Sequence, residues 1–200
     1  MKKTLLMCTG LSGSGKSYFI ENYLPNGLFH MLIVGTTRPQ RPGEIEGIDR
    51  YYMTEEYFTE NKDKFITWSW INEFMWKDGD PKWMYGVPEF EVNKNNDKNL
   101  VYDIIEPKYI RQMIDWFKLH GLDQEYDFKI AWFLPPENNF DTVRARANMP
   151  NDEDVRRHNT CDAIDFLRAG IYPDYILKCS AEEVILDQRL IQHIEQLHKQ

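Results

Sequence analysis

Short apolar runs alternate along the chain with longer stretches in which apolar residues recur at helical spacing. A short apolar run bounded by polar residues favours a buried strand, whereas the longer pattern favours a helix. The predicted strands are residues 5–9, 30–34, 100–105, 128–134 and 175–177, and the predicted helices are residues 16–23, 107–120, 152–169 and 181–197. This alternation predicts an α/β fold with a parallel sheet that helices cover on both faces.

Two segments break the alternation. Residues 36–98 are rich in aromatic residues, glycine, proline and charge, and we interpret them as a small strand-rich insert. Residues 136–158 are polar and rich in arginine, as a mobile flap would be. A chain of 200 residues has the length of one domain. We therefore predict a single domain whose core is residues 1–35, 99–135 and 159–200, with the insert and the flap attached to it.

Composition narrows the kind of partner that the chain can bind. A net charge of -8 argues against a surface that coats nucleic acid, because such a surface needs clustered lysine and arginine. The three cysteines are widely spaced and show no metal-type spacing, which indicates a reduced, cytoplasmic protein. The apolar run near the start is too short for a signal peptide, and no run approaches the length of a membrane span. We expect no membrane partner.

The stretch GLSGSGKS, residues 10–17, fits the phosphate-binding pattern G-x-x-x-x-G-K-[ST]. Its glycines allow backbone N–H groups to point inward, and the start of the following helix adds to this anion site. Lys16 would reach the β- and γ-phosphates of a nucleoside triphosphate, and Ser17 would offer a hydroxyl to Mg²⁺. A Gly/Ser-rich turn that matches by chance is the alternative. The predicted ATP-binding residues are Gly10, Ser12, Gly13, Ser14, Gly15, Lys16 and Ser17.

Two arginines follow in a loop that proline keeps from being helical. Arg38 and Arg41 are each followed by a proline, Pro39 and Pro42. The guanidinium group of arginine can hold a phosphate monoester through two parallel hydrogen bonds. The residues alone leave open whether this loop binds a phosphate or is merely charged and solvated.

The same loop resembles a known family. Residues 36–49 match TTR-x-x-R-x-GE-x-x-G-x-D, the signature of guanylate kinases. Weaker similarities follow in the family's order: residues 65–68 resemble F-[IL]-E-W, residues 85–87 resemble Y-Y-G-[TS], and residues 133–136 resemble F-[IL]-x-P-P. The resemblance extends from about residue 3 to residue 180, which is nearly the whole chain.

The resemblance implies a P-loop kinase core, an insert that binds a nucleoside monophosphate, and a helical lid, which correspond to the three parts predicted above. It also implies a nucleoside monophosphate kinase-type phosphotransferase, in which ATP and a monophosphate give ADP and a diphosphate with Mg²⁺. Such transfer depends on alignment and charge neutralisation more than on a side-chain base. The implied catalytic residues are Lys16, Arg38, Arg41, Arg146 and Arg157, and the implied metal ligands are Ser17 and Asp103.

Some of these assignments keep alternatives. Arg146 matches the first arginine of the family's lid, with Arg144 close by, and either Arg157 or Arg156 matches the second. A solvated basic helix face would explain the same arginines. Asp103 would hold Mg²⁺ through water, but an aspartate at a strand end can also cap the next turn.

The residues that would hold the acceptor depart from the family pattern. Thr67 stands where members use a carboxylate to hold guanine, and Ile105 stands where they use a second acidic residue. Arg50 replaces the tyrosine after G-x-D, a phosphate ligand in the family. The implied acceptor-binding residues are Thr37, Arg38, Arg41, Arg50, Tyr52, Thr67, Tyr85 and Asp103. We therefore expect the acceptor to be another or modified (deoxy)nucleotide rather than ordinary GMP.

Three other functions fit parts of the sequence. A relative of guanylate kinase that phosphorylates ribose 1,5-bisphosphate also lacks the base-reading residues, although it lacks the R-P-G-E loop as well. Some guanylate-kinase-like domains only bind phosphopeptides, but their P-loops are degraded and the loop here is intact. A kinase of nucleic-acid ends is disfavoured by the net charge. The expected partners are ATP and a small phosphorylated acceptor, and a homodimer is left open.

Overall fold

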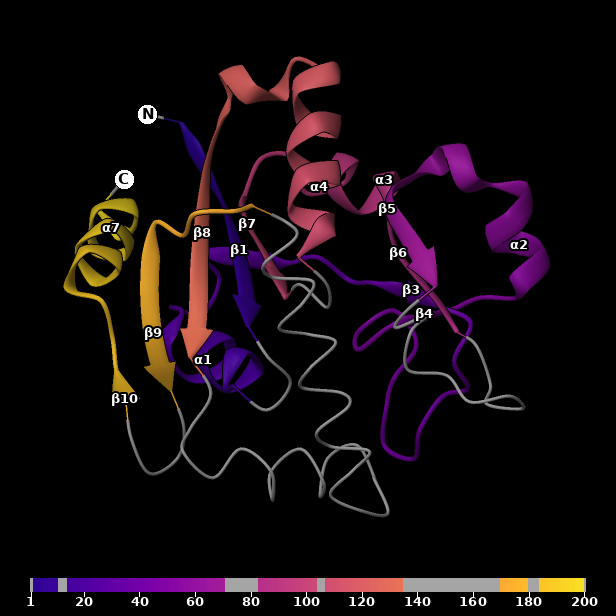
Figure 1. Cartoon of the computed structure of the whole chain (residues 1–200), viewed down its shortest axis with the longest axis horizontal. Coiled ribbons are helices and arrows are strands. Elements are labelled where there is room, and N and C mark those ends of the chain that lie inside the picture. The colour runs from indigo at the N-terminus through magenta and orange to yellow at the C-terminus, as the bar shows by residue number, and fades with distance from the viewer. Residues whose placement is uncertain are drawn as a thin grey trace.

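A six-stranded sheet forms the centre of the computed structural model, which describes residues 2–10, 14–70, 83–103, 107–134, 170–179 and 184–199 (Figure 1). The strand order is β10-β9-β8-β1-β7-β2, and every neighbouring pair is parallel except β10 with β9. The predicted parallel sheet is confirmed. The strands are β1 (Lys3–Gly10), β2 (Phe29–Met31), β7 (Asn99–Asp103), β8 (Tyr126–Leu134), β9 (Tyr175–Cys179) and β10 (Val184–Ile185).

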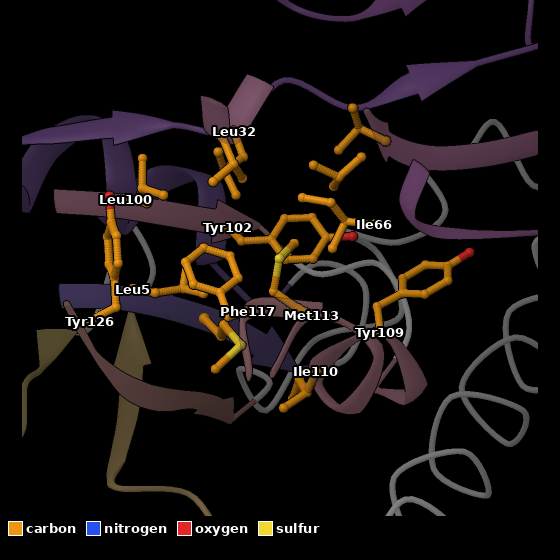
Figure 2. Close-up of a cluster of buried hydrophobic side chains, with 14 residues drawn as sticks. Leu5, Leu32, Ile66, Leu100, Tyr102, Tyr109, Ile110, Met113, Phe117 and Tyr126 are labelled. Carbon is orange, nitrogen blue, oxygen red and sulfur yellow. The ribbon is translucent and has the colours of Figure 1, made fainter. Parts of the chain in front are cut away.

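Helices cover both faces of this sheet, as the sequence predicts. Side chains along a strand point alternately to opposite faces, so Leu5 and Leu6 of β1 enter different apolar clusters. The cluster around Leu5 includes Met113 and Phe117 of α4 (Lys108–Leu119), and Figure 2 shows their side chains gathered beside β1 and β7. The cluster around Leu6 includes residues of α1 (Lys16–Tyr23) and α7 (Gln188–His198).

The segment between β2 and β7 forms a second, smaller sheet with the order β4-β3-β6-β5. This segment is strand-rich, as expected, and lies to one side of the main sheet (Figure 1). Its first short helix begins after Thr54, whose side chain caps it, and its second begins after Pro88. The elements are β3 (Gly35–Thr36), β4 (Tyr51–Tyr52), α2 (Glu55–Glu60), β5 (Phe65–Trp70), β6 (Met84–Pro88) and α3 (Glu89–Asn93).

One apolar cluster joins the two sheets. Ile66 of β5 and Val87 of β6 are buried together with Tyr102 of β7 and Met113 of α4. In Figure 2 the ring of Tyr102 extends from β7 toward Ile66. The smaller sheet therefore shares the core of the main sheet and is held to it by apolar contacts.

The predicted strand at residues 30–34 is too long at its end. Only Phe29–Met31 pairs with β7, and the chain then passes to the smaller sheet. The backbone shows the transfer, because Leu32 still donates to Val101 whereas the carbonyl of Val34 accepts from Tyr51. An apolar run marks burial in both settings, so its composition could not show this change of partner.

The predicted helix at residues 181–197 begins too early. The helix α7 starts at Gln188, where the side chain of Asp187 caps it by accepting from the N–H of Arg189 at 3.0 Å. Before that point, β10 pairs with β9. Its two residues, Val184 and Ile185, are β-branched and favour a strand. The predicted helix 152–169 and the predicted lid 136–158 lie outside the described residues.

No helix in the described part of the chain is long and apolar enough to cross a membrane.

Candidate active site

The predicted phosphate loop lies between the end of β1 and the start of α1. Gly10 ends β1, and Gly15 precedes α1 with a φ of 90°, a conformation that favours glycine. Ser14 is buried. Ser12 and Gly13 lie outside the described residues.

Gly10 is in close contact with the neighbouring strand. A Cβ atom built at this position would overlap the carbonyl oxygen of Phe133 and lie 2.8 Å from Ser14 Oγ. Only glycine therefore lets the loop leave the sheet at this point without a shift of β8.

Replacing Gly10 by alanine is expected to reduce stability by about 1–3 kcal/mol, as overpacking does, and to weaken ATP binding. Thermal unfolding and titration with ATP check the two effects. Gly27→Ala is the matched control, because Gly27 also has a positive φ, of 79°, but its Cβ would meet nothing within 4 Å. That variant should keep its ATP affinity. Unchanged ATP affinity in Gly10→Ala would contradict a tight loop at this position.

Three polar side chains meet where α1 begins. Lys16 Nζ donates to the carbonyl of Gly10 at 2.9 Å, so the side chain folds back over the loop. Ser17 Oγ donates to Asp103 Oδ2 at 3.1 Å. Asp103 ends β7 and pairs in register with Cys8 of β1, which explains why it reaches the start of α1. The structure thus brings the two predicted metal ligands together.

The Ser17–Asp103 pair suits Mg²⁺. This ion prefers oxygen ligands, and in kinases it is usually held by one or two protein oxygens together with substrate phosphates and water. A hydroxyl beside a carboxylate supplies that donor set. Across the residues that the structure describes, no cluster of three or more His, Cys, Asp or Glu side chains could hold a metal without a substrate.

Arg38 is the centre of a second polar cluster. Its side chain is only 6% exposed, and Nη2 donates to both oxygens of Glu44, at 2.7 and 3.0 Å. Tyr52 donates its hydroxyl to the same carboxylate at 2.7 Å, and its ring lies 5.9 Å from the guanidinium carbon. Burial acts to lower the pKa of Arg38, but the hydrogen bonds and charges of Glu44 and Tyr85 raise it above its ordinary value. Arg38 is therefore a fixed, permanently charged group.

Glu44 organises this loop, and the sequence argument did not single it out. Besides Arg38 and Tyr52, it accepts from the backbone N–H of Arg41 at 2.7 Å. The side chain of Arg41 itself is exposed. The signal that could have found Glu44 is its spacing, since it lies six and three residues after the two arginines in a loop that proline punctuates. We name the group Arg38, Glu44, Tyr52 and Tyr85 the arginine cluster.

The hydrogen bond from Arg38 lowers the pKa of Glu44 from 4.5 to about 2, and the backbone N–H of Arg41 and the hydroxyl of Tyr52 act in the same direction. A lowered carboxyl pKa stabilises the fold above the ordinary pKa, and this contribution is lost as pH falls toward the folded-state pKa. We expect the wild-type protein to lose stability between about pH 5 and pH 2, and Glu44→Gln to lose less over that range. Thermal unfolding at a series of pH values measures this, with Glu195→Gln on α7 as a control. An identical pH dependence in Glu44→Gln and the wild type would contradict the role of Glu44.

A cavity of about 190 Å³ lies between the phosphate loop and the acceptor loop. Ser17 and Asp103 line it on one side, and Glu44 and Arg50 line it on the other. Two further carboxylates, Glu21 and Asp49, and apolar side chains from α1 and from residues 31–34 complete the wall. Arg50, which replaces the family's tyrosine, thus faces the same space as the predicted metal ligands. The guanidinium of Arg50 donates through Nη1 to the carbonyl of Asp49 at 2.7 Å.

The two predicted acceptor-binding threonines do not line this cavity. Thr37 Oγ1 accepts from the backbone N–H of Met84 at 2.8 Å. Thr67 is fully buried, and its Oγ1 accepts from the N–H of Val87 at 3.2 Å and lies 3.3 Å from the hydroxyl of Tyr102. Both hydroxyls thus satisfy the backbone of β6. The lid arginines Arg146 and Arg157, their alternatives Arg144 and Arg156, and Ile105 lie outside the described residues.

Comparison with known proteins finds guanylate kinases both by sequence and by fold. No protein-family model matches the chain. The guanylate kinases of Streptococcus pyogenes serotype M3 (strain MGAS315) and serotype M18 (strain MGAS8232) are each 34% identical to it over 98 residues, or 48% of this chain. The match spans 43% of each relative, which is less than half of its length.

The fold comparison extends over almost the entire chain. The crystal structure of guanylate kinase from Anaplasma phagocytophilum superposes with a TM-score of 0.52 at 18% identity. The superposition covers 99% of this chain and 84% of that protein. The chain is thus similar in sequence to guanylate kinases over about half of its length, and it shares the fold of a guanylate kinase over nearly all of it.

Proposed function

We propose that the protein transfers a phosphoryl group from ATP to a nucleoside monophosphate other than ordinary GMP. The observation that carries the proposal is the cavity that Ser17 and Asp103 share with Glu44 and Arg50. Ser17, at the end of the phosphate-binding pattern that suits a triphosphate donor, lies on one side of it, and Arg50, in the loop that carries the predicted acceptor arginines, lies on the other. The chain would thus be one kinase domain with an acceptor-binding insert and a lid.

On the donor side, the backbone from Gly10 to Ser17 would hold the phosphates of ATP. Lys16, now bonded to the carbonyl of Gly10, would turn to the β- and γ-phosphates. Ser17, and Asp103 through water, would hold Mg²⁺, which would supply positive charge against the donor phosphates.

On the acceptor side, Arg38 would bind the phosphate of the acceptor, with Arg41, Tyr52 and Tyr85 beside it. Glu44 fixes the Arg38 guanidinium in advance, so little conformational entropy would be lost on binding. A phosphate monoester has a second pKa near 6 and is already a nucleophile at neutral pH, so no general base is required. Arg50 would face the transferring group from the cavity wall.

The lid arginines Arg146 and Arg157 would close over the reacting phosphates. Closure would exclude water and so suppress hydrolysis of ATP.

The residue at position 67 supports an acceptor whose base is not guanine. Guanine offers N–H donors that the family meets with carboxylates, and Thr67 offers at most a hydroxyl that the N–H of Val87 already occupies. An unpaired buried donor costs about 1–3 kcal/mol. Loss of both carboxylates, at the positions of Thr67 and Ile105, would reduce the preference for guanine by orders of magnitude.

The experiment is phosphoryl transfer from ATP and Mg²⁺ to a panel of acceptors. The panel holds the common ribo- and deoxyribonucleoside monophosphates and ribose 1,5-bisphosphate. Turnover of a nucleotide other than GMP supports the proposal, and a clear preference for GMP contradicts the altered acceptor. Turnover of ribose 1,5-bisphosphate alone would identify a phosphosugar kinase. ATP binding without turnover of any acceptor would favour a binding module.

A further inference from the structure

Glu91 of α3 is a fully buried carboxylate with partners in two strands and at the end of its own helix. His30 Nε2 of β2 donates to Oε1 at 2.7 Å, and Tyr51 of β4 donates its hydroxyl to Oε2 at 2.6 Å. Lys94, which follows α3, lies with Nζ 3.1 Å from Oε2 and also donates to the Tyr51 hydroxyl at 2.9 Å. Glu91 thus connects the edge strand of the main sheet to the edge strand of the smaller one.

The partners keep this carboxylate charged. Burial acts to raise the pKa of Glu91, but the hydrogen bonds from Tyr51, His30 and Lys94 together lower it below its ordinary value. A buried ion pair seldom adds net stability over apolar residues of the same shape. The network is therefore more informative about geometry than about stability, because its hydrogen bonds fix three elements in one arrangement.

Tyr51 connects this network to the acceptor loop. Side chains alternate along a strand, so Arg50 and Tyr52 point to the side opposite Tyr51. On that side Arg50 lines the cavity and Tyr52 bonds to Glu44. The backbone N–H of Tyr51 also donates to the carbonyl of Val34 at 3.1 Å. Tyr51 thus holds the strand in place from the side opposite Arg50 and Tyr52.

We propose that Glu91 is a positioning residue for the acceptor site. By holding Tyr51 from behind and His30 on the main sheet, it fixes Arg50 and Tyr52 relative to the Ser17–Asp103 pair. This inference rests on the function proposed above. It predicts that breaking the Glu91–Tyr51 bond weakens acceptor binding and leaves ATP binding unchanged, because the hydrogen bonds that the described residues make with Glu91 and Tyr51 come from β2, β4, Val34 and the end of α3.

The test is a double-mutant cycle of Glu91→Gln and Tyr51→Phe, read as the KM of the acceptor, kcat and the affinity for ATP. Each single variant should raise the acceptor KM about tenfold with a much smaller change in kcat, and the double variant should be no worse than Glu91→Gln alone. Tyr57→Phe, on exposed α2 of the same insert, is the matched control. Additive effects, or an equal loss of ATP affinity, would overturn the proposal.

A second readout separates failure of this inference from failure of the proposed function. Inorganic phosphate is titrated by ³¹P NMR while a non-hydrolysable ATP analogue with Mg²⁺ fills the phosphate loop, so that the acceptor site is the remaining site. If the wild type turns over no acceptor, weaker phosphate binding in Tyr51→Phe still supports the positioning role. Equal phosphate affinity in the wild type and Tyr51→Phe, or no phosphate binding by the wild type, overturns it. Tyr51→Phe removes only a hydroxyl and serves if Glu91→Gln fails to fold.

Discussion

Replacing Lys16 by alanine is expected to lower kcat for phosphoryl transfer by about 10³-fold with little change in the fold. The expectation follows from the position of Lys16 at the first turn of α1, where its ammonium group would offset charge on the transferring phosphate. The hydrogen bond from Lys16 to the carbonyl of Gly10 is only partly buried, so its loss should change the free energy of unfolding by about 1 kcal/mol.

Steady-state kinetics with ATP and the acceptor identified by the panel measures this loss. Lys118→Ala is the control, since Lys118 is an exposed lysine at the far end of α4. Transfer by Lys16→Ala within tenfold of the wild-type rate would contradict a phosphate-binding role for the loop.

Replacing Arg38 by alanine is expected to lower kcat/KM for the acceptor by about 10²–10⁴-fold while the affinity for ATP stays unchanged. Arg38 belongs to the arginine cluster and not to the phosphate loop, so the effect should fall on one substrate. Arg38→Lys should recover little of the activity. A lysine keeps the charge but cannot hold Glu44 with one nitrogen and the carbonyl of Pro39 with another, as Arg38 does, and it cannot offer a planar pair of donors to a phosphate.

The measurement combines acceptor kinetics with titration of ATP, and thermal unfolding reports the cost of leaving Glu44 without its partner. The double variant Arg38→Ala/Glu44→Gln removes both charges and separates that cost from the loss of binding. Loss of ATP affinity in Arg38→Ala would be inconsistent with an acceptor site at this loop.

The elements that the sequence predicted well are those whose signals are local. The strand before the phosphate-binding pattern and the helix after it lie where the sequence predicts them, and the central strands follow from apolar runs that are buried on both faces of a sheet. The ends of elements were less accurate. The pairing of Val184 and Ile185 with β9, and the transfer of the chain from β2 to β3, depend on partners that are distant in sequence.

The candidate site shows the same division. Asp103 could be placed beside Ser17 from the resemblance alone, because the motif order implies neighbouring strands. The hydrogen bond that Thr67 accepts from Val87 could not be predicted, because it depends on the register of β5 with β6 and on the irregularity between Phe65 and Thr67. No sequence motif indicates the hydrogen bonds of Glu91, since its partners His30 and Tyr51 lie 61 and 40 residues away.

The apolar cluster that joins the two sheets limits how acceptor specificity can be engineered. Thr67 lies next to Ile66, and its hydroxyl is near that of Tyr102, so the position proposed to face the base adjoins the hydrophobic core. A glutamate grafted at Thr67 to restore guanine reading would bring a charge to the edge of that core and displace the bond to Val87. The insert therefore cannot be exchanged independently of the main sheet. A change of base would require β5, β6 and β7 to be redesigned together.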